Sequence, residues 1–329
     1  MQPTIINLNS IEIFKDYNPS IKVPMWPANN FCDPIDANFA HRQGVAEAIA
    51  YYLMERFNGI TTDGLILEGP TGSGKSSSLR QLLAQLNFPI HSDVGTSNTE
   101  KEVLLGRLDP IEGMLVFKDG PLTTAARHGH AFLFEERDCA PADINKGLNS
   151  VLDGYPIHLA ESGDGERVSL GKYFFFAATQ NTSAGNDFSG ESPAAQCQDA
   201  SSEDRFEKVY VPYMESEHEE AILENRFGQF VPMEIIKQSV KAANMCRSVY
   251  VGNRSSTPHP DLKQPTHQCG LAISTRGLLR FIRKVIQLQA INSPEEMIKT
   301  ALDRAFSLDK VTHSDKLFIE EAFLSSMLS

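Results

Sequence analysis

The sequence has a deficit of positive charge, no paired cysteines and no long apolar run. Its 329 residues include 30 Lys and Arg against 42 Asp and Glu, which gives a formal net charge of −12. This balance argues against a surface built mainly to bind nucleic acid, so nucleic acid is not an expected partner. The five cysteines form no CxxC pair, which fits a reducing compartment better than a disulfide framework.

Hydrophobic segments suited to a membrane are also missing. No stretch approaches the roughly 18 consecutive apolar residues that a spanning helix needs. The opening MQPTIINLNS lacks the basic start and apolar stretch of a leader peptide. We therefore expect no membrane span and a cytoplasmic location. With 41% hydrophobic residues, the chain can still bury a substantial core.

Short apolar runs alternate with helical patterns in the first two thirds of the chain. The clearest runs are LILEG (65–69), AFLF (131–134) and YFFFAAT (173–179). Short apolar strands separated by helices indicate a parallel sheet with both faces covered, and so an α/β fold. After about residue 214 the pattern is helical only, which predicts a smaller C-terminal domain built of helices.

This change of pattern divides the chain into three predicted parts. Residues 1–40, rich in Pro and Asn, are expected to form an N-terminal arm that packs on, or links to, the main body. Residues 41–214 are the predicted α/β domain, and residues 215–329 the helical domain. Within the latter, the polar, Pro-containing stretch 252–270 is predicted to be a surface loop.

The strongest motif is a glycine-rich loop between the first apolar run and a helical pattern. The stretch GPTGSGKS (69–76) fits G-x-x-x-x-G-K-[ST], in which backbone N–H groups hold phosphate oxygens. We expect Lys75 to reach the terminal phosphates and the Ser76 hydroxyl to ligate Mg²⁺, with ATP as the nucleotide. A glycine-rich turn without a ligand is the alternative, and the strand-loop-helix context counts against it. The predicted nucleotide-binding residues are Gly69, Pro70, Thr71, Gly72, Ser73, Gly74, Lys75, Ser76 and Ser77.

Polar residues follow two later apolar runs. Glu135 and Glu136 come directly after AFLF, and Asn181 ends YFFFAATQN. In a parallel α/β sheet, ligands bind beyond the carboxyl ends of the strands, so these side chains are site candidates. Because successive strand residues point to opposite sides, we assign Glu135 to the metal and Glu136 to the attacking water. The alternatives are a solvated loop for the two acids and ordinary turn chemistry for Asn181.

Taken in order, these motifs resemble those of an AAA+ ATPase of the MoxR and dynein-related branch. The order is the P-loop, the strand with two acids, the strand ending in Asn181, DRF (204–206), and a Ser-Thr-Arg (274–276) that opens a helix. The resemblance covers nearly the whole chain. Within the branch it is closest to the CobS-type AAA+ subunit of aerobic cobaltochelatase, on the early IKVP, FKDG (117–120) and VYVPYMESEHEEAI after DRF.

The resemblance implies roles for further residues. Asn181 would be the sensor 1 residue, and Arg276 the sensor 2 arginine on the lid. Arg205 matches the arginine finger, which acts on the nucleotide of an adjacent subunit, so a ring, most simply a hexamer, is implied. Two simpler fates remain open from the residues alone: Arg205 could pair with Glu203 or Asp204, and Arg276 could lie on a solvated helix face.

The chain departs from the family pattern at Glu135, where the family has Asp. The side chain is one methylene longer, which puts magnesium affinity or rate in question, although it remains a hard anionic oxygen ligand. The branch also carries extra β-hairpins, and residues 106–120 and 154–173 are the plausible equivalents. Four residues in or beside the loop 252–270 match no tight zinc pattern, so a metal is not expected there: Cys246, His259, His267 and Cys269.

The predicted function is that of a ring-forming ATPase that remodels a partner protein. The resemblance implies that this partner carries a von Willebrand A-type domain. Two alternatives stay open: the motor subunit of a cobalt or magnesium chelatase, and a nucleotide-gated binding or structural module with little turnover.

Overall fold

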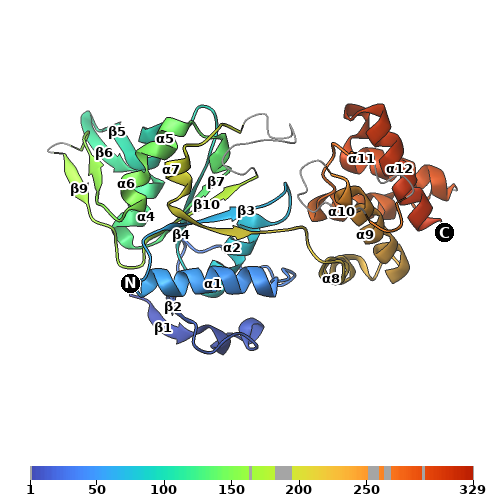
Figure 1. Cartoon of the computed structure of the whole chain (residues 1–329), viewed down its shortest axis with the longest axis horizontal. Coiled ribbons are helices and arrows are strands. Elements are labelled where there is room, and N and C mark those ends of the chain that lie inside the picture. Colours follow the sequence, from blue (N-terminus) through green and yellow to red (C-terminus); the bar gives the residue numbers. More distant parts are fainter. Residues whose placement is uncertain are drawn as a thin grey trace.

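In the computed structural model the chain folds into an α/β body followed by a lobe of helices (Figure 1). The structure describes residues 2–162, 165–181, 195–250, 259–262, 268–290 and 293–328. Among these residues, no helix combines the length and the apolar character needed to cross a membrane.

The body is built on a five-stranded sheet with the order β11-β3-β10-β7-β4, and every neighbouring pair is parallel. The three central strands carry the apolar runs of the sequence and are almost wholly buried, as expected for a sheet covered on both faces. The predicted α/β parallel-sheet fold is confirmed. The strands are β3 (Gly64–Glu68), β4 (Ile90–Val94), β7 (Ala131–Glu135), β10 (Phe175–Gln180) and β11 (Phe206–Tyr210).

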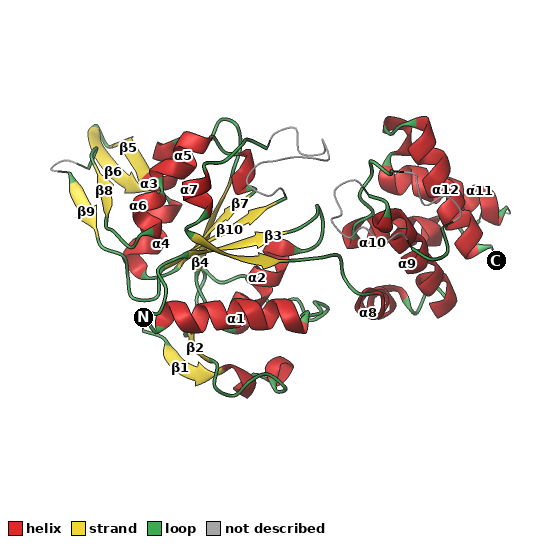
Figure 2. Cartoon of the chain, viewed as in Figure 1, coloured by secondary structure: helices red, strands yellow, loops and turns green. Residues whose placement is uncertain are grey.

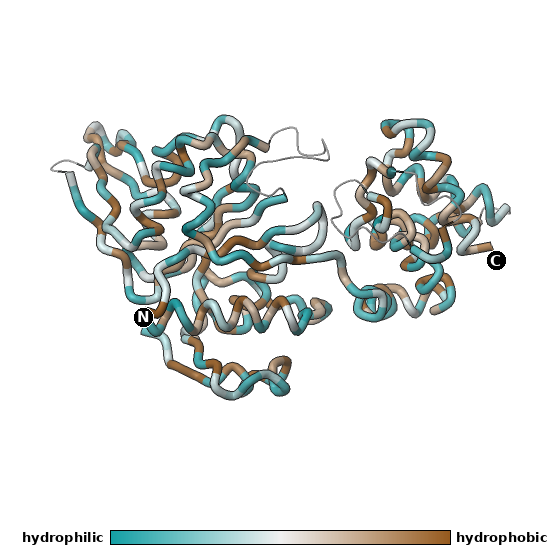
Figure 3. Tube along the Cα trace, viewed as in Figure 1, coloured by the Kyte–Doolittle hydropathy of each residue, from teal (hydrophilic) through white to brown (hydrophobic). Residues whose placement is uncertain are grey.

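Successive strand residues supply two separate cores. Leu133 of β7 packs with α1 (Gln43–Phe57) and α2 (Lys75–Gln85) on one face, whereas its neighbours Phe132 and Phe134 pack with α4 (Pro121–His128) and α6 (Asn149–Leu152) on the other. Figure 2 shows helices on both sides of the sheet, and Figure 3 shows apolar stretches along the central strands. Each such side chain contributes about 1.5–3 kcal/mol by leaving water.

The N-terminal segment packs on the main body. It consists of β1 (Thr4–Asn7), paired antiparallel with β2 (Lys22–Met25), and two 3₁₀ turns, η1 (Leu8–Ser10) and η2 (Glu12–Phe14). Phe14 and Trp26 are buried in the same core as α1 and α2. The segment is therefore held by the core of the α/β body.

Two antiparallel hairpins extend from the body on the side away from the helical lobe (Figure 1). They are β5 (Gly106–Ile111) with β6 (Met114–Asp119), and β8 (Ile157–Leu159) with β9 (Glu166–Val168). Both fall where the sequence predicted extra hairpins. Glu112 and Gly113 both have positive φ, as a two-residue hairpin turn requires.

The helical lobe has a hydrophobic core of its own. Its helices are α8 (Ser216–Phe227), α9 (Met233–Ser248), α10 (Thr275–Gln287), α11 (Pro294–Phe306) and α12 (His313–Met327), with the 3₁₀ turn η4 (Leu308–Lys310). The predicted helical C-terminal region is confirmed. Most of the predicted loop 252–270, including His267, lies outside the described residues. The remaining short helices of the body are α3 (Lys101–Leu105), η3 (Arg137–Cys139), α5 (Ala142–Gly147) and α7 (Ala200–Glu203).

Candidate nucleotide-binding site

The glycine-rich loop joins the carboxyl end of β3 to the first residue of α2, as its sequence predicted. Gly72 and Gly74 have φ of 75° and 88°, a region that side chains with a Cβ rarely adopt. A Cβ on Gly69 would lie 2.2 Å from the Val211 carbonyl oxygen. Ser73 Oγ is buried and has no hydrogen-bond partner among the described residues. The loop is thus a tight backbone turn with a buried polar atom left over, which suits a bound phosphate.

Lys75 is the buried cation of this loop. Its Nζ donates hydrogen bonds to the carbonyl oxygens of Gly69 and Pro70, at 2.9 and 3.0 Å, and to Oδ1 of Asn181 at 2.7 Å. The structure therefore brings together two predicted residues, Lys75 and Asn181, that are 106 positions apart. Before Lys75 can contact a phosphate, it must exchange some of these oxygens for those of the nucleotide.

Burial lowers the pKa of Lys75 to about 8, and nearby carboxylates oppose this shift. The largest opposing contribution is from Asp138, followed by Glu136 and Glu68. Asp138 is buried, and its Oδ2 accepts the backbone N–H of Asn181 at 3.0 Å. Sequence reasoning missed Asp138, because it considered only the two acids directly after the strand. Its position, three residues after the end of the strand, was the signal in the sequence that could have identified it.

The two predicted acids have different surroundings. Glu135, at the end of β7, accepts hydrogen bonds from Arg80 of α2 through Oε1, at 2.6 and 3.3 Å. Glu136 is exposed, has φ of 51°, and donates its backbone N–H to Thr179 Oγ1 at 3.1 Å. The adjacent acids are thus separated as expected, but the pairing of Glu135 with Arg80 was not foreseen.

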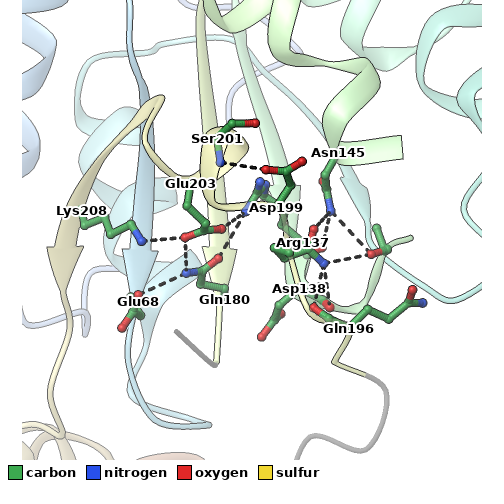
Figure 4. Close-up of polar contacts among 12 residues, drawn as sticks. Glu68, Arg137, Asp138, Asn145, Gln180, Gln196, Asp199, Ser201, Glu203 and Lys208 are labelled. Atoms are coloured by element: carbon green, nitrogen blue, oxygen red, sulfur yellow. Dashed lines mark hydrogen bonds and ion pairs between the residues drawn. The ribbon is translucent and has the colours of Figure 1, made fainter. Parts of the chain in front are cut away.

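A buried polar network lies beside the site (Figure 4). Glu203 accepts hydrogen bonds from Arg137 at 2.5 Å and from Lys208 at 2.6 Å, and Gln180 donates to Glu68 at 3.1 Å. Burial alone raises the pKa of Glu203, but Lys208 and Arg137 outweigh it and hold the pKa below its usual value. Gln180 precedes Asn181 in the chain, so the network borders the nucleotide edge of the sheet.

Arg205 lies at the other edge of the sheet. Its backbone oxygen accepts the N–H of Gly64, where β3 begins, whereas the P-loop follows the end of β3. A five-residue strand spans about 16 Å, so Arg205 is far from the P-loop of its own chain. Its side chain pairs with Asp153 at 2.7 and 3.2 Å. The acids considered from the sequence, Glu203 and Asp204, are not its ion-pair partners.

Arg276 lies close to the P-loop. Ser274 caps α10 by accepting the N–H of Gly277 at 3.1 Å, and a Cβ on Gly72 would lie 2.4 Å from Ser274 Cβ. Arg276, two residues on, is exposed and forms no ion pair or hydrogen bond with the part of the chain that the structure describes. The start of α10 thus lies beside the phosphate loop, and Arg276 is two residues from this contact.

A second contact between the lobes was not predicted. Tyr213 Oη donates a hydrogen bond to the Thr71 carbonyl at 3.4 Å, and the Arg247 guanidinium lies 5.0 Å from the Tyr213 ring. Arg247 is buried, pairs with Glu219 at 2.7 and 2.8 Å, and donates to the Ile273 carbonyl. The P-loop and the start of α10 are therefore linked through packed side chains.

The four residues considered for zinc belong to the second lobe, and one of them, His267, lies outside the described residues. Cys246 and Cys269 are both buried, and burial raises the pKa of Cys246 well above its usual value. No cluster of three or more His, Cys, Asp or Glu side chains is placed to hold a metal ion in the ranges that the structure describes.

Part of the chain that carries this geometry is similar to a known family of domains. Residues 64–194 match the model of the AAA domain of the dynein-related subfamily. The similarity to an AAA domain is confined to this segment. The segment contains the P-loop, both acids and Asn181. This match supports the predicted enzyme class, an ATP hydrolase of the AAA+ type.

The relatives are similar over part of this chain, and the chain spans about half or less of their own length. Midasin of Giardia intestinalis is 36% identical over 121 residues, which are 36% of this chain and 2% of that protein. Protein NorQ of Paracoccus denitrificans is 29% identical over 147 residues, 45% of this chain and 52% of that protein. Among solved structures, Thermotoga maritima RuvB has 12% identity and a TM-score of 0.49, over 84% of this chain and 73% of that one. The finer resemblance to cobaltochelatase stays a prediction.

The residues of the AAA domain fit ATP and Mg²⁺. The glycine cradle and the unsatisfied Ser73 hydroxyl suit phosphate oxygens, and buried Lys75 supplies a cation. Ser76 and Glu135 would hold Mg²⁺ together with phosphate oxygens and water, since Mg²⁺ usually keeps several waters and takes one or two carboxylates.

Proposed function

We propose that this chain is a ring-forming ATPase of the MoxR type, which couples ATP hydrolysis to the remodelling of a partner protein. One observation carries the proposal. Lys75, Asn181 and Asp138 converge at the carboxyl edge of the sheet, whereas Arg205 lies at the opposite edge. Such a site has its own phosphate-binding loop and its own carboxylates. It needs a second copy of the chain to supply the arginine finger.

Each residue of the chain then has a physical task. Lys75 and the loop N–H groups bind the phosphates, and Asn181 and Glu136 orient the attacking water. Bound Mg²⁺ would neutralise charge on the phosphate oxygens. Arg276 of the lid contacts the phosphates once the lobes close, which suits an arginine with no partner among the described residues.

Arg205 of a neighbouring copy would stabilise charge on the transferring phosphoryl group. A guanidinium supplied in this way is worth about 10³–10⁵ in rate in related phosphoryl transfers. Its bidentate pair with Asp153 holds the side chain, which is 32% exposed, and Arg205 would exchange this partner for the phosphoryl group of the neighbour.

Turnover of the purified protein with its partner tests this proposal. We expect Glu136→Gln to bind ATP with the affinity of the parent and to hydrolyse it at least about 100-fold more slowly, the typical size of a lost acid–base contribution. Equal hydrolysis by the parent and this variant would refute a catalytic role of Glu136. It would favour the alternative of a nucleotide-gated module with little turnover.

The partner is proposed on the resemblance alone to carry a von Willebrand A-type domain. The exposed apolar tip of the first hairpin, with Met114 and Leu115 at 67% and 70% exposure, offers a surface for a protein contact. Isolation of the tagged chain with bound ATP, followed by identification of what co-purifies, tests this. A von Willebrand A-type protein supports remodelling, whereas a large chelatase subunit supports the metal-chelatase motor.

A further inference from the structure

Arg80 of α2 is held between two carboxylates that come from distant parts of the chain. Its Nη1 donates to Asp33 Oδ2 at 2.8 Å, and its Nη2 donates to Glu135 Oε1 at 2.6 Å and to Ser92 Oγ at 2.8 Å. The three side chains of this charged group, Asp33, Arg80 and Glu135, are 24–33% exposed. Hydrogen bonds to both acids raise the pKa of Arg80 despite the opposing effect of burial.

The contact uses only one oxygen of Glu135. Both Nε and Nη2 of Arg80 donate to Oε1, and Oε2 has no hydrogen-bond partner within the described ranges. Arg80 follows Ser76 by four residues, so the two side chains lie on the same face of α2. Arg80 thus holds Glu135 against the face of α2 that carries the Ser76 hydroxyl, which is the proposed Mg²⁺ ligand. Oε2 of Glu135 stays available for the metal.

The length of Glu135 makes such a partner useful. An aspartate in this position is short and needs little further restraint, whereas a glutamate has one more rotatable bond to fix. At 2.6 Å the Arg80 contact is a short, charge-assisted hydrogen bond, the kind that orients a carboxylate strongly. Shortening residue 135 by a methylene would withdraw the oxygen by about 1.5 Å and break the contact.

The charge of the group also matters. A lone Arg80 would cancel the charge of Glu135 and weaken its attraction for a cation. Because Asp33 shares the same guanidinium, the three groups together keep a net charge of −1. The carboxylate is therefore oriented without loss of the negative charge that Mg²⁺ requires.

We propose that Arg80 is a positioning residue that adapts Glu135 to the magnesium site, with Asp33 of the N-terminal segment preserving the charge. The inference rests on the proposed function, in which Glu135 holds the metal. Hydrogen-bond partners of metal-ligating carboxylates typically contribute 10–100-fold to metal affinity. Arg80 is assigned such a contribution at a site where the protein has Glu instead of Asp.

The test is a double-substitution cycle read by equilibrium binding, which needs no turnover. Binding of fluorescent ADP is titrated with Mg²⁺ for the parent, Arg80→Gln, Glu135→Asp and the double variant. We expect Arg80→Gln to raise the Mg²⁺ concentration at half-effect about tenfold, with metal-free ADP affinity unchanged. In the Glu135→Asp background the same change should shift it less than about twofold, because that contact is already broken.

Two further variants keep the test decisive. Arg80→Lys retains the charge and should recover part of the Mg²⁺ affinity, and Asp33→Asn should shift the Mg²⁺ midpoint in the direction of Arg80→Gln. If thermal melts show that Arg80→Gln folds poorly, these two variants still test the proposal. An unchanged or lower Mg²⁺ midpoint in the Arg80 variants, or equal shifts in both backgrounds, overturns the inference. Failure of the parent to bind ADP at any Mg²⁺ concentration would instead refute the proposed function.

Discussion

Mild acid is expected to destabilise the α/β body through a group of stacked imidazoles beneath the N-terminal segment. His91 of β4 and His130, just before β7, share a hydrogen bond of 3.0 Å between Nε2 and Nδ1, with ring planes 4° apart. Trp26 and Phe31 of the N-terminal segment pack on these rings, at centroid distances of 5.2 and 5.4 Å. One shared hydrogen bond between stacked rings requires at least one neutral imidazole.

The sign and size of the effect follow from the pKa of His130. Burial, with further contributions from His91 and His128, lowers this pKa from 6.5 to about 4. Below pH 6.5 the unfolded chain takes up the proton and the folded chain does not, so stability falls as the pH falls towards 4. Between pH 7 and pH 5 this single group costs about 2 kcal/mol of unfolding free energy. The pKa of His91 is lowered in the same direction, mainly by burial.

The only tryptophan of the chain, Trp26, is 6% exposed and provides the assay. Urea unfolding is followed by its fluorescence at pH 7 and pH 5, for the parent and for His130→Gln. The variant keeps a neutral hydrogen-bonding side chain, and we expect its stability to fall by about 2 kcal/mol less than that of the parent over this range. An equal loss in both proteins would show that His130 is not the titrating group.

Three further outcomes are expected. Glu203→Gln leaves Arg137 as a buried, poorly compensated cation and should lower the unfolding free energy by about 3–5 kcal/mol in urea titrations. Gly72→Ala puts a Cβ on a residue with positive φ, and this Cβ would also clash with Ser274 at the start of α10. The positive φ alone should lower the unfolding free energy by about 1–2 kcal/mol in the same assay. Asp153→Asn breaks an exposed pair with Arg205 and should leave the urea midpoint unchanged.

The sequence predicted those features that depend on local pattern. Apolar runs gave the parallel sheet, since strands covered on both faces need no polar alternation. Glu135, Glu136 and Asn181 could be proposed as neighbours because parallel strands bring their carboxyl ends to one edge, and the structure places them at or directly after the ends of β7 and β10. The P-loop was found because its glycines and lysine are contiguous. In each case the signal lies within a few residues of the chemistry.

The partners of these residues could not be predicted, because they come from segments far away in the chain. Arg80 and Glu135 are 55 positions apart, and Arg205 and Asp153 are 52 apart. From sequence, the nearest acids were the natural candidates for Arg205, but Glu203 is taken by Arg137 and Lys208, and folding brings Asp153 to Arg205. Such pairings are set by packing of the sheet and its helices.

The two predicted catalytic arginines should act on different nucleotides, and their positions make this testable. Arg276 lies beside the P-loop of its own chain, whereas Arg205 lies at the far edge of the sheet. Subunits that carry Arg205→Ala keep an intact P-loop, and subunits that carry Lys75→Ala keep the arginine finger, Arg205. In rings assembled from an equal mixture, about one quarter of the sites should combine the two and recover ATP hydrolysis.

Arg276→Ala provides the matched control, because it should impair only the nucleotide site of the subunit that carries it. Mixed with Lys75→Ala subunits it should recover nothing, since both defects fall on the site of the subunit that carries them. Mixed with Arg205→Ala subunits it should recover activity, since the Arg276→Ala subunit still supplies the finger. Recovery in the first mixture, or failure in the second, would contradict the assignment of one arginine to each side of the subunit interface. Recovery in the first mixture would mean that Arg276 acts on the nucleotide of a neighbouring subunit, and failure in the second would mean that both arginines act on the same nucleotide.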